Sequence, residues 1–215
     1  MSSLLPRRGR VTFEEIASLV GRDDPIILEI GANDGSDSRR FLDAFSNCRL
    51  FCFEPDSRAV LKWRRSIRDE RAKLAPLAVG AVDGTVTFHP SAGRGERPAD
   101  WDQSGSIRAP KNHLKLHSVT FPTTVNVACT RLDTWLASEH IDRIDFIWAD
   151  VQGAEGDLVA GASRTLAMTR YFYTEYSDNE LYEGQINLST LARMLPDFEM
   201  AMLFRSDVLF KSTKL

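Results

Sequence analysis

The order of apolar and polar residues predicts alternating strands and helices. Apolar runs that do not alternate with polar residues, such as 26–30, where Glu29 is the one polar residue, and 50–53, are typical of strands buried on both faces of a parallel sheet, and helical spacing follows them. Thr12 begins a capping box with Glu15, which predicts a first helix that ends at Gly21. The remaining pattern predicts strands at 26–30, 50–53, 75–82, 85–89, 125–130, 144–149, 171–176, 200–204 and 208–211, and helices at 36–45, 57–71, 132–136, 154–166 and 187–195.

This pattern predicts an α/β fold with helices on both faces of the sheet and a closing antiparallel pair at the C-terminus. Residues 1–24 are predicted to be an arm and a helix that precede the domain at 25–215. Within that domain, 91–122 is polar and rich in Gly and Pro. A loop of this length in a compact domain is usually a lid or a binding loop.

Composition limits the class of protein. The chain has 215 residues, 43% of them hydrophobic and 27% charged, which excludes a disordered chain. Lys and Arg number 27 against 30 Asp and Glu, so the net charge of −3 disfavours general binding to nucleic acid. No apolar run approaches the roughly 20 residues of a membrane-spanning helix. The arginine-rich start and three cysteines without paired spacing indicate a cytoplasmic protein.

Three loops carry candidate chemistry because ligands of open α/β sheets bind beyond the carboxyl ends of the strands. They are 31–36, 54–56 and 150–155. Gly31 and Gly35 would let the backbone approach a ligand closely, and their Gly-x-x-x-Gly spacing departs from the dinucleotide-binding pattern. Taken one at a time, Gly31 and Gly35 are also consistent with ordinary turn glycines, and Glu54 with an acid on the surface.

The charges around these loops favour a nucleoside with a cationic end. Glu29 and Asp34 flank the glycine loop, where carboxylates would repel a pyrophosphate and attract an ammonium or sulfonium group. Glu54 ends the second strand, where a carboxylate can bind a ribose diol through both oxygens. S-adenosylmethionine has these properties.

Four segments resemble the FkbM family of class I S-adenosylmethionine-dependent methyltransferases, most of which methylate hydroxyls of sugars and natural products. They are Leu28–Ser36, Phe53–Pro55, Leu132–Asp133 and Ile144–Glu155. The resemblance covers about residues 26–177. It implies a Rossmann-like, mostly parallel sheet of seven strands, with Glu54 on the cofactor ribose and Asp150 close to the transferred methyl group.

Two residues depart from the family pattern near the expected active site. Trp148 stands where the family usually has Lys, and Gln152 stands where it favours Glu. Because both positions lie near the expected active site, these differences affect the expected acceptor and mechanism more than the expected fold.

A hydroxyl acceptor needs a base within hydrogen-bond reach, and Asp150 is the leading candidate; its alternative role is a helix cap. Glu155 and Glu175 would frame a magnesium site with Asp150, but no tight ligand motif is present and we assign no metal ligand. His113 is either a base or substrate contact, or a solvated loop histidine. We assign catalysis to Asp150, Glu155, Glu175 and His113, and cofactor binding to Glu29, Gly31, Asn33, Asp34, Gly35, Ser36, Glu54, Pro55, Gly80, Ala81, Asp150, Val151 and Gln152.

The sequence therefore predicts S-adenosylmethionine-dependent O-methylation of a sugar or another small molecule. Basic residues in 91–122 suggest an acceptor with phosphate or carboxylate, or a solvated charged lid; they are Arg94, Arg97, Arg108, Lys111 and Lys115. The alternatives are a cofactor-binding scaffold without catalysis, a nicotinamide-dependent oxidoreductase and a nucleic acid methyltransferase.

Overall fold

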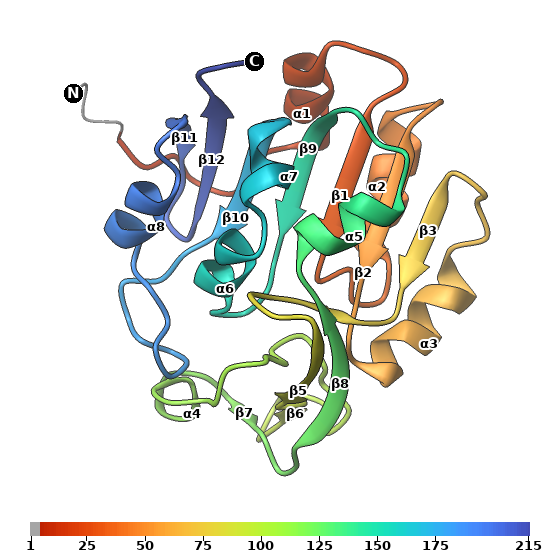
Figure 1. Cartoon of the computed structure of the whole chain (residues 1–215). Coiled ribbons are helices and arrows are strands. Elements are labelled where there is room, and N and C mark those ends of the chain that lie inside the picture. Colours follow the sequence, from red (N-terminus) through yellow and green to blue (C-terminus); the bar gives the residue numbers. More distant parts are fainter. Residues whose placement is uncertain (1–4) are drawn as a thin grey trace.

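The computed structural model describes residues 5–215, which fold around a central sheet of seven strands (Figure 1). The strand order is β11-β12-β10-β9-β1-β2-β3. Five adjacent strands, β10 to β3 in that order, are parallel, and β12 runs antiparallel to both β10 and β11. The expected α/β class, with an antiparallel C-terminal pair, is confirmed. The sheet consists of β1 (Ile26–Ile30), β2 (Arg49–Phe53), β3 (Ala72–Ala75), β9 (Ile144–Ala149), β10 (Thr169–Glu175), β11 (Phe198–Leu203) and β12 (Asp207–Ser212).

Helices cover both faces of the sheet and enclose a hydrophobic core on each side. Phe41 and Trp63 belong to the core under the first three helices, and Leu158 and Leu191 belong to the core on the opposite face. All five residues of β1, Glu29 included, are buried, which explains why its apolar residues do not alternate with exposed polar ones. The helices of the two layers are α1 (Phe13–Val20), α2 (Ser36–Ala44) and α3 (Ser57–Ser66) on one face, and α5 (Leu132–Ser138), α6 (Glu155–Ala160), α7 (Ser163–Ala167) and α8 (Leu188–Met194) on the other.

The capping box predicted for the first helix is confirmed. The hydroxyl of Thr12 accepts a hydrogen bond from the N–H of Glu15 at 3.2 Å, and the Glu15 carboxylate accepts one from the N–H of Thr12 at 3.0 Å. Gly21 ends α1 at a φ of 65°, a backbone conformation that favours glycine.

The third strand predicted at 75–82 is wrong. The chain forms β3 at the edge of the main sheet and then β4 (Ala78–Val79), which pairs with β8 (Val125–Thr130) in a separate sheet of order β4-β8-β5. Pro76 lies between the two strands, and its missing N–H prevents the ladder from continuing. The other partner of β8 is β5 (Gly84–Phe88).

One predicted helix was too long, and another is divided in two. α3 ends at Ser66, where the buried Ile67 caps it, and does not reach residue 71. The helix predicted at 154–166 is divided into α6 and α7 around Gly161. A Cβ atom at Gly161 would lie 2.0 Å from the carbonyl oxygen of Gly80, so this helix break packs directly against the chain that follows β4.

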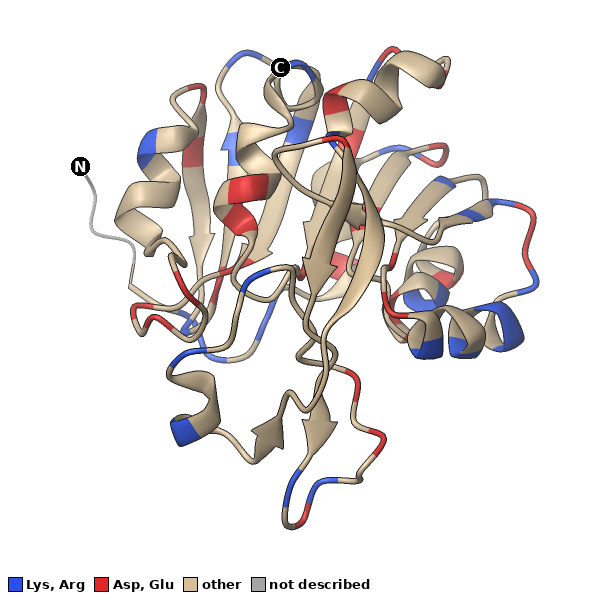
Figure 2. Ribbon diagram, turned by 60° about the horizontal axis from the view of Figure 1, so that its bottom comes forward, with Lys and Arg blue, Asp and Glu red and all other residues tan. Residues whose placement is uncertain are grey.

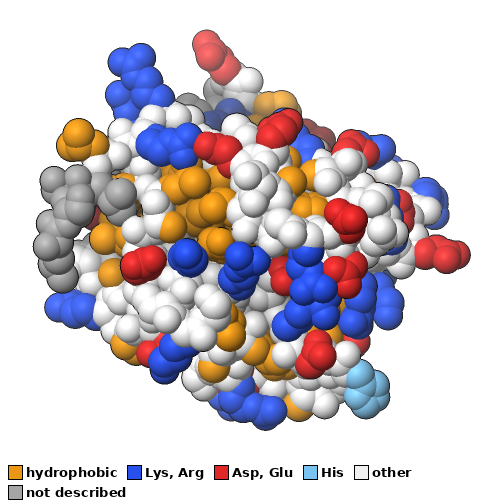
Figure 3. All heavy atoms as spheres, turned by 90° about the horizontal axis from the view of Figure 1, so that it is seen from above, with side chains coloured by type: hydrophobic (Ala, Val, Ile, Leu, Met, Phe, Trp, Pro, Cys, Tyr) orange, Lys and Arg blue, Asp and Glu red, His pale blue; other side chains and the backbone are white. Residues whose placement is uncertain are grey.

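The segment 91–122 protrudes beyond the carboxyl ends of the strands and has structure of its own. It contains the paired strands β6 (Ala92–Gly93) and β7 (Val119–Thr120) and the short helix α4 (His113–Leu116). Figure 2 shows Lys and Arg beside Asp and Glu along it. Figure 3 shows the opposite end of the molecule, where both charge signs surround a small hydrophobic area. Within residues 5–215, no helix combines the length and the apolar character needed to cross a membrane.

Candidate functional site

A cavity of about 480 Å³ opens at the carboxyl ends of β1, β2 and β9. In chain order, β1, β2 and β3 extend the sheet in one direction, and β9 then pairs with the other side of β1. The cavity lies at this change of direction, beside β1. Such switch points are where open α/β sheets bind ligands. Ten of the residues predicted to bind the cofactor line this cavity: Glu29, Gly31, Asn33, Asp34, Ser36, Glu54, Pro55, Asp150, Val151 and Gln152.

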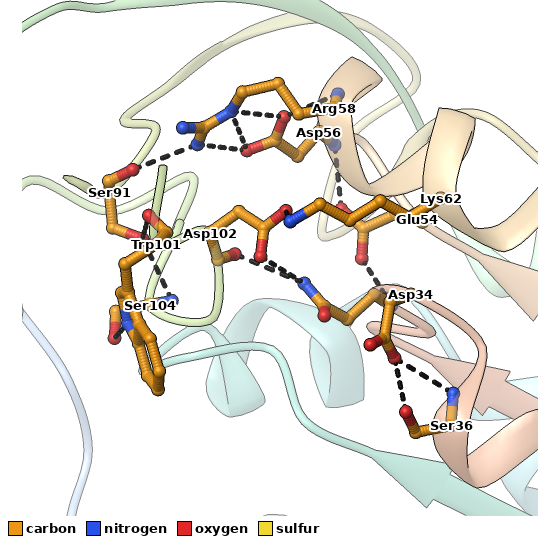
Figure 4. Close-up of polar contacts among 11 residues, drawn as sticks. Asp34, Ser36, Glu54, Asp56, Arg58, Lys62, Ser91, Trp101, Asp102 and Ser104 are labelled. Carbon is orange, nitrogen blue, oxygen red and sulfur yellow. Dashed lines mark hydrogen bonds and ion pairs between the residues drawn. The ribbon is translucent and has the colours of Figure 1, made fainter. Parts of the chain in front are cut away.

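Glu54 is held at the end of β2 by two backbone hydrogen bonds (Figure 4). One carboxylate oxygen accepts from the N–H of Asn33 at 2.9 Å and the other from the N–H of Asp56 at 2.7 Å. Burial raises the pKa of Glu54 to about 7, although these two hydrogen bonds act in the opposite direction. The carboxyl group therefore has a fixed orientation in the cavity, as binding of a ribose diol requires.

Glu29 lies deeper, within β1, and accepts hydrogen bonds on one oxygen. The hydroxyl of Ser38 donates to it at 2.5 Å and the thiol of Cys52 at 3.3 Å, while the Trp63 indole donates to Ser38 at 2.9 Å. Burial raises the pKa of Glu29 to about 8. Glu29 therefore holds its proton more firmly than an exposed acid in the ligand-free protein.

The protruding segment is tied to α3 beside the first cavity, whose lining includes Asn33 and Asp102 (Figure 4). The buried carboxylate of Asp102 pairs with Lys62 of α3 at 2.7 Å, and the Asn33 side-chain amide reaches Asp102 at 3.3–3.4 Å. Arg58 pairs with Asp56 and donates to the carbonyl oxygen of Ser91 at 3.0 Å. Asp102 and Lys62 were missed at the sequence level, since no local pattern connects positions 40 residues apart.

Asp150 directly follows β9 and Glu175 is the last residue of β10, and the side chain of Gln152 bridges them. The Gln152 amide nitrogen donates to Asp150 Oδ1 at 2.7 Å and to Glu175 Oε2 at 3.3 Å, and its oxygen accepts from the Tyr182 hydroxyl at 3.0 Å. Burial raises the pKa of Asp150, and the charge of Asp150 raises that of Glu175 well above its ordinary range. Gln152 holds this position at a φ of 50°, which is unusual for a residue other than glycine.

A second cavity, of about 350 Å³, adjoins the first and shares Gln103, Gln152 and Glu175 with it. Glu155 and His113 also line this second cavity. Glu155 accepts a hydrogen bond from the N–H of Gly153 at 3.1 Å, and burial raises its pKa to about 7.

Burial lowers the pKa of His113 to about 4, and the neighbouring His117 adds to this effect. Among the described residues 5–215, Nδ1 of His113 has no hydrogen-bond partner. His113 is thus a buried neutral imidazole beside the second cavity, in contrast to the solvated loop histidine that was its alternative reading.

Three predicted cofactor residues do not line the first cavity: Gly35, Gly80 and Ala81. Gly35 caps α2 at a φ of 86°. Gly80 and Ala81 follow β4, and it is Ala78 and Val79 of that strand that line the cavity. Within residues 5–215, His, Cys, Asp and Glu side chains form no group of three or more suited to a metal ion.

The lining of the first cavity suits S-adenosylmethionine. The side chains of Leu77, Val79, Phe88 and Ile107 offer apolar surface for a base, and Glu54 offers a carboxyl group for a ribose. A Cβ atom at Gly31 would lie 1.9 Å from the Asp150 carbonyl oxygen, so this position is kept free of a side chain. The backbones of the two loops therefore pack directly against each other at this point.

Comparison with known proteins gives two matches at the sequence level. The family model described as "Methyltransferase FkbM domain" matches residues 29–210. The 2-O-methyltransferase NoeI of Sinorhizobium fredii (strain NBRC 101917 / NGR234) is 47% identical over 216 residues, an alignment that covers 98% of this chain and 88% of NoeI.

Solved structures resemble this chain in fold. An rRNA methylase from Streptococcus thermophilus is 10% identical with a TM-score of 0.50, and a putative rRNA-methylase from Clostridium thermocellum is 9% identical with a TM-score of 0.50. Each alignment covers 93% of both chains. Identities this low show a shared methyltransferase fold and give no information on the acceptor.

Proposed function

The chain belongs to the FkbM family of methyltransferases, and we propose that it methylates the 2-hydroxyl of an uncharged sugar. It is an S-adenosylmethionine-dependent O-methyltransferase. The scaffold and oxidoreductase alternatives are not favoured by these relatives. The 2-hydroxyl is proposed because the relative at 47% identity is named a 2-O-methyltransferase.

The observation that carries the proposal is the pair Asp150 and Glu175: Asp150 lines the first cavity, Glu175 lines both cavities, and Gln152 bridges the two carboxylates. S-adenosylmethionine supplies a methyl group on a cationic sulfur. An acceptor hydroxyl in the second cavity would lose its proton to one of these carboxylates as its oxygen forms the new bond to carbon. Because their pKa values are raised, the carboxylates are stronger bases than exposed ones.

Gln152 would position the two bases. Its amide engages one oxygen of each carboxylate, which leaves Asp150 Oδ2 and Glu175 Oε1 free of the amide. The Tyr182 hydroxyl lies 3.0 Å from the Gln152 side-chain oxygen and 2.8 Å from the Ser104 carbonyl oxygen, two acceptors for its one proton.

Charge pairing supports an uncharged acceptor over the anionic one suggested by the sequence. Arg108 pairs with Asp157 at 2.6 Å and Lys111 pairs with Glu180 at 2.5 Å, so these cations are already neutralised. Arg97, by contrast, lines the second cavity without a salt bridge among the described residues 5–215, and its guanidinium lies over the Trp101 ring at 4.1 Å. The second cavity offers neutral hydrogen-bonding side chains that suit a polyol, among them Gln103, Ser104, Tyr176, Ser177, Tyr182, Gln185 and Ser206.

The proposed location is the cytoplasm. Cys48, Cys52 and Cys129 are all buried free thiols, as expected for a protein of a reducing compartment.

Methyl transfer can be measured with labelled S-adenosylmethionine and a matched acceptor panel, analysed by mass spectrometry. The panel contains methyl glycosides of common hexoses, their 2-deoxy counterparts and their 6-phosphates. We expect methylation of a neutral glycoside and none of its 2-deoxy form. Asp150→Asn and Glu175→Gln should each lower the rate by about 100-fold, the usual contribution of a general base. Exclusive methylation of the phosphorylated sugars, or equal rates with the 2-deoxy forms, would refute the proposed acceptor.

A further inference from the structure

Arg10 lines the first cavity, although it lies in the arm that precedes the first helix. Its guanidinium stacks over the Trp148 ring at 5.0 Å. Among the described residues 5–215, its salt-bridge partner is Asp37, at 3.7 Å, which is longer than a direct hydrogen bond. The Tyr173 hydroxyl and the Asp207 carboxylate are also close enough to interact with it, and its charge acts on Asp150 and Glu175. A guanidinium has five donors, so most of the hydrogen-bonding capacity of Arg10 remains available to a ligand.

The chain on either side of Arg10 is anchored. The N–H of Arg7 donates to the carbonyl oxygen of Leu203 at 2.8 Å, and the Arg7 side chain pairs with Glu15 at 2.5 Å. Val11, directly after Arg10, is 1% exposed within the core, and Thr12 caps α1. The backbone therefore holds Arg10 at the cavity, and a ligand would not have to order the arm.

The surroundings of Arg10 match an amino acid zwitterion. Asp37, in the N-terminal turn of α2, pairs with Arg10 at 3.7 Å and with Arg40 at 3.4 Å, and these residues and Ser36 all line the cavity. Cationic side chains and the exposed N–H groups of a helix N-terminus attract a carboxylate, while Asp34 and Asp37 attract an ammonium group. Glu54 lies in another part of this cavity, at the end of β2, where the ribose is proposed to bind.

We infer that Arg10 binds the carboxylate of the methionine moiety of S-adenosylmethionine. The inference rests on the proposed function and deepens it, because it assigns the amino acid end of the cofactor to the N-terminal arm. No feature near residue 10 in the sequence indicates this role; the contact depends on how the arm crosses the sheet.

Two ligands separate this role from a structural one. S-adenosylhomocysteine carries the amino acid end, whereas 5′-deoxy-5′-methylthioadenosine keeps the nucleoside and the thioether without it. Binding of each is measured by calorimetry to wild type, Arg10→Met, Arg10→Lys and Arg8→Ala. Methionine preserves packing on Trp148 without the charge, and the exposed Arg8 is the matched control from the same arm.

We expect Arg10→Met to weaken S-adenosylhomocysteine binding by roughly 10- to 100-fold and methylthioadenosine binding by less than about twofold. Arg10→Lys should fall between Arg10→Met and wild type, and Arg8→Ala should match wild type. An equal loss for both ligands, or no loss for either, would overturn the inference. If wild type bound neither ligand, the proposed function itself would fail, and this outcome is distinct from the others.

Discussion

The backbone of Gly31 lies against the carbonyl group of Asp150, so close that a Cβ atom on Gly31 would be 1.9 Å from the oxygen. The two residues follow β1 and β9, which are neighbours in the sheet. The close approach fixes the position of Asp150 relative to the glycine loop.

Gly31→Ala should therefore destabilise the protein by at least about 3 kcal/mol, because it combines a backbone clash with a strained φ of 89°. Gly95→Ala is the matched control, since Gly95 has a φ of 67° and no atom within 4 Å of its added Cβ. The control should cost about 1 kcal/mol. Denaturant-induced unfolding measures the free energy of unfolding of both variants. Equal losses in the two variants would show that the close contact between Gly31 and Asp150 does not affect stability.

Glu29 should make the stability of the ligand-free protein depend on pH. Its folded-state pKa of about 8 exceeds the ordinary 4.5, so the folded state holds the proton more firmly than the unfolded state. This contribution is complete below about pH 4.5 and is lost as the pH rises to about 8. At most about 5 kcal/mol is involved, at ~1.4 kcal/mol per pKa unit.

Glu29→Gln should remove this contribution, so the variant loses less stability than wild type between pH 5 and 8 in urea unfolding. Glu14→Gln, an exposed acid on α1, should retain the wild-type slope. A Glu29→Gln slope identical to that of wild type would mean that Glu29 is ionised in the folded protein.

The strands and the three binding loops could be predicted from the sequence because their signals are local. The run Ile26–Ile30 is buried throughout, and the glycine loop and Glu54 meet at one cavity, as the rule for parallel sheets requires. Pro76 was a local signal too, and it marks where the predicted third strand breaks.

Long-range contacts carried no such signal. The pairing of Lys62 with Asp102 depends on how the protruding segment folds back on α3, and the position of Arg10 depends on the path of the arm. The raised pKa of Glu29 follows from its burial beside Ser38, which a list of acidic residues cannot show.

Lys62→Met should loosen the protruding segment over the cofactor cavity. The change leaves the buried carboxylate of Asp102 without its cation, so closure of the segment costs about 1–2 kcal/mol more and S-adenosylmethionine binds roughly tenfold more weakly. Calorimetry and limited proteolysis within 91–105 test this. Arg65→Met, on the exposed side of α3, is the control and should bind as wild type does. Unchanged affinity and unchanged cleavage in Lys62→Met would contradict a closing role for this pair.

Gln152→Glu should lower the methylation rate by roughly tenfold or more, because a third carboxylate would replace the amide that donates to Asp150 and Glu175. Gln152→Met tests the loss of the donors without added charge and should be impaired less. Initial rates at saturating S-adenosylmethionine measure both variants. If both stay within about twofold of wild type, Gln152 does not position the bases.

The central claim, a cofactor site for S-adenosylmethionine built around Glu54, is tested most directly by calorimetric titration of the purified protein. S-adenosylmethionine and NAD are titrated separately into wild type, Glu54→Ala and the exposed-site control Glu70→Ala. We predict that wild type and the control bind S-adenosylmethionine alike and do not bind NAD. Glu54→Ala should bind at least about tenfold more weakly, since it loses the charged contact to the ribose. Binding of NAD in preference to S-adenosylmethionine, or an unchanged affinity in Glu54→Ala, would contradict the account.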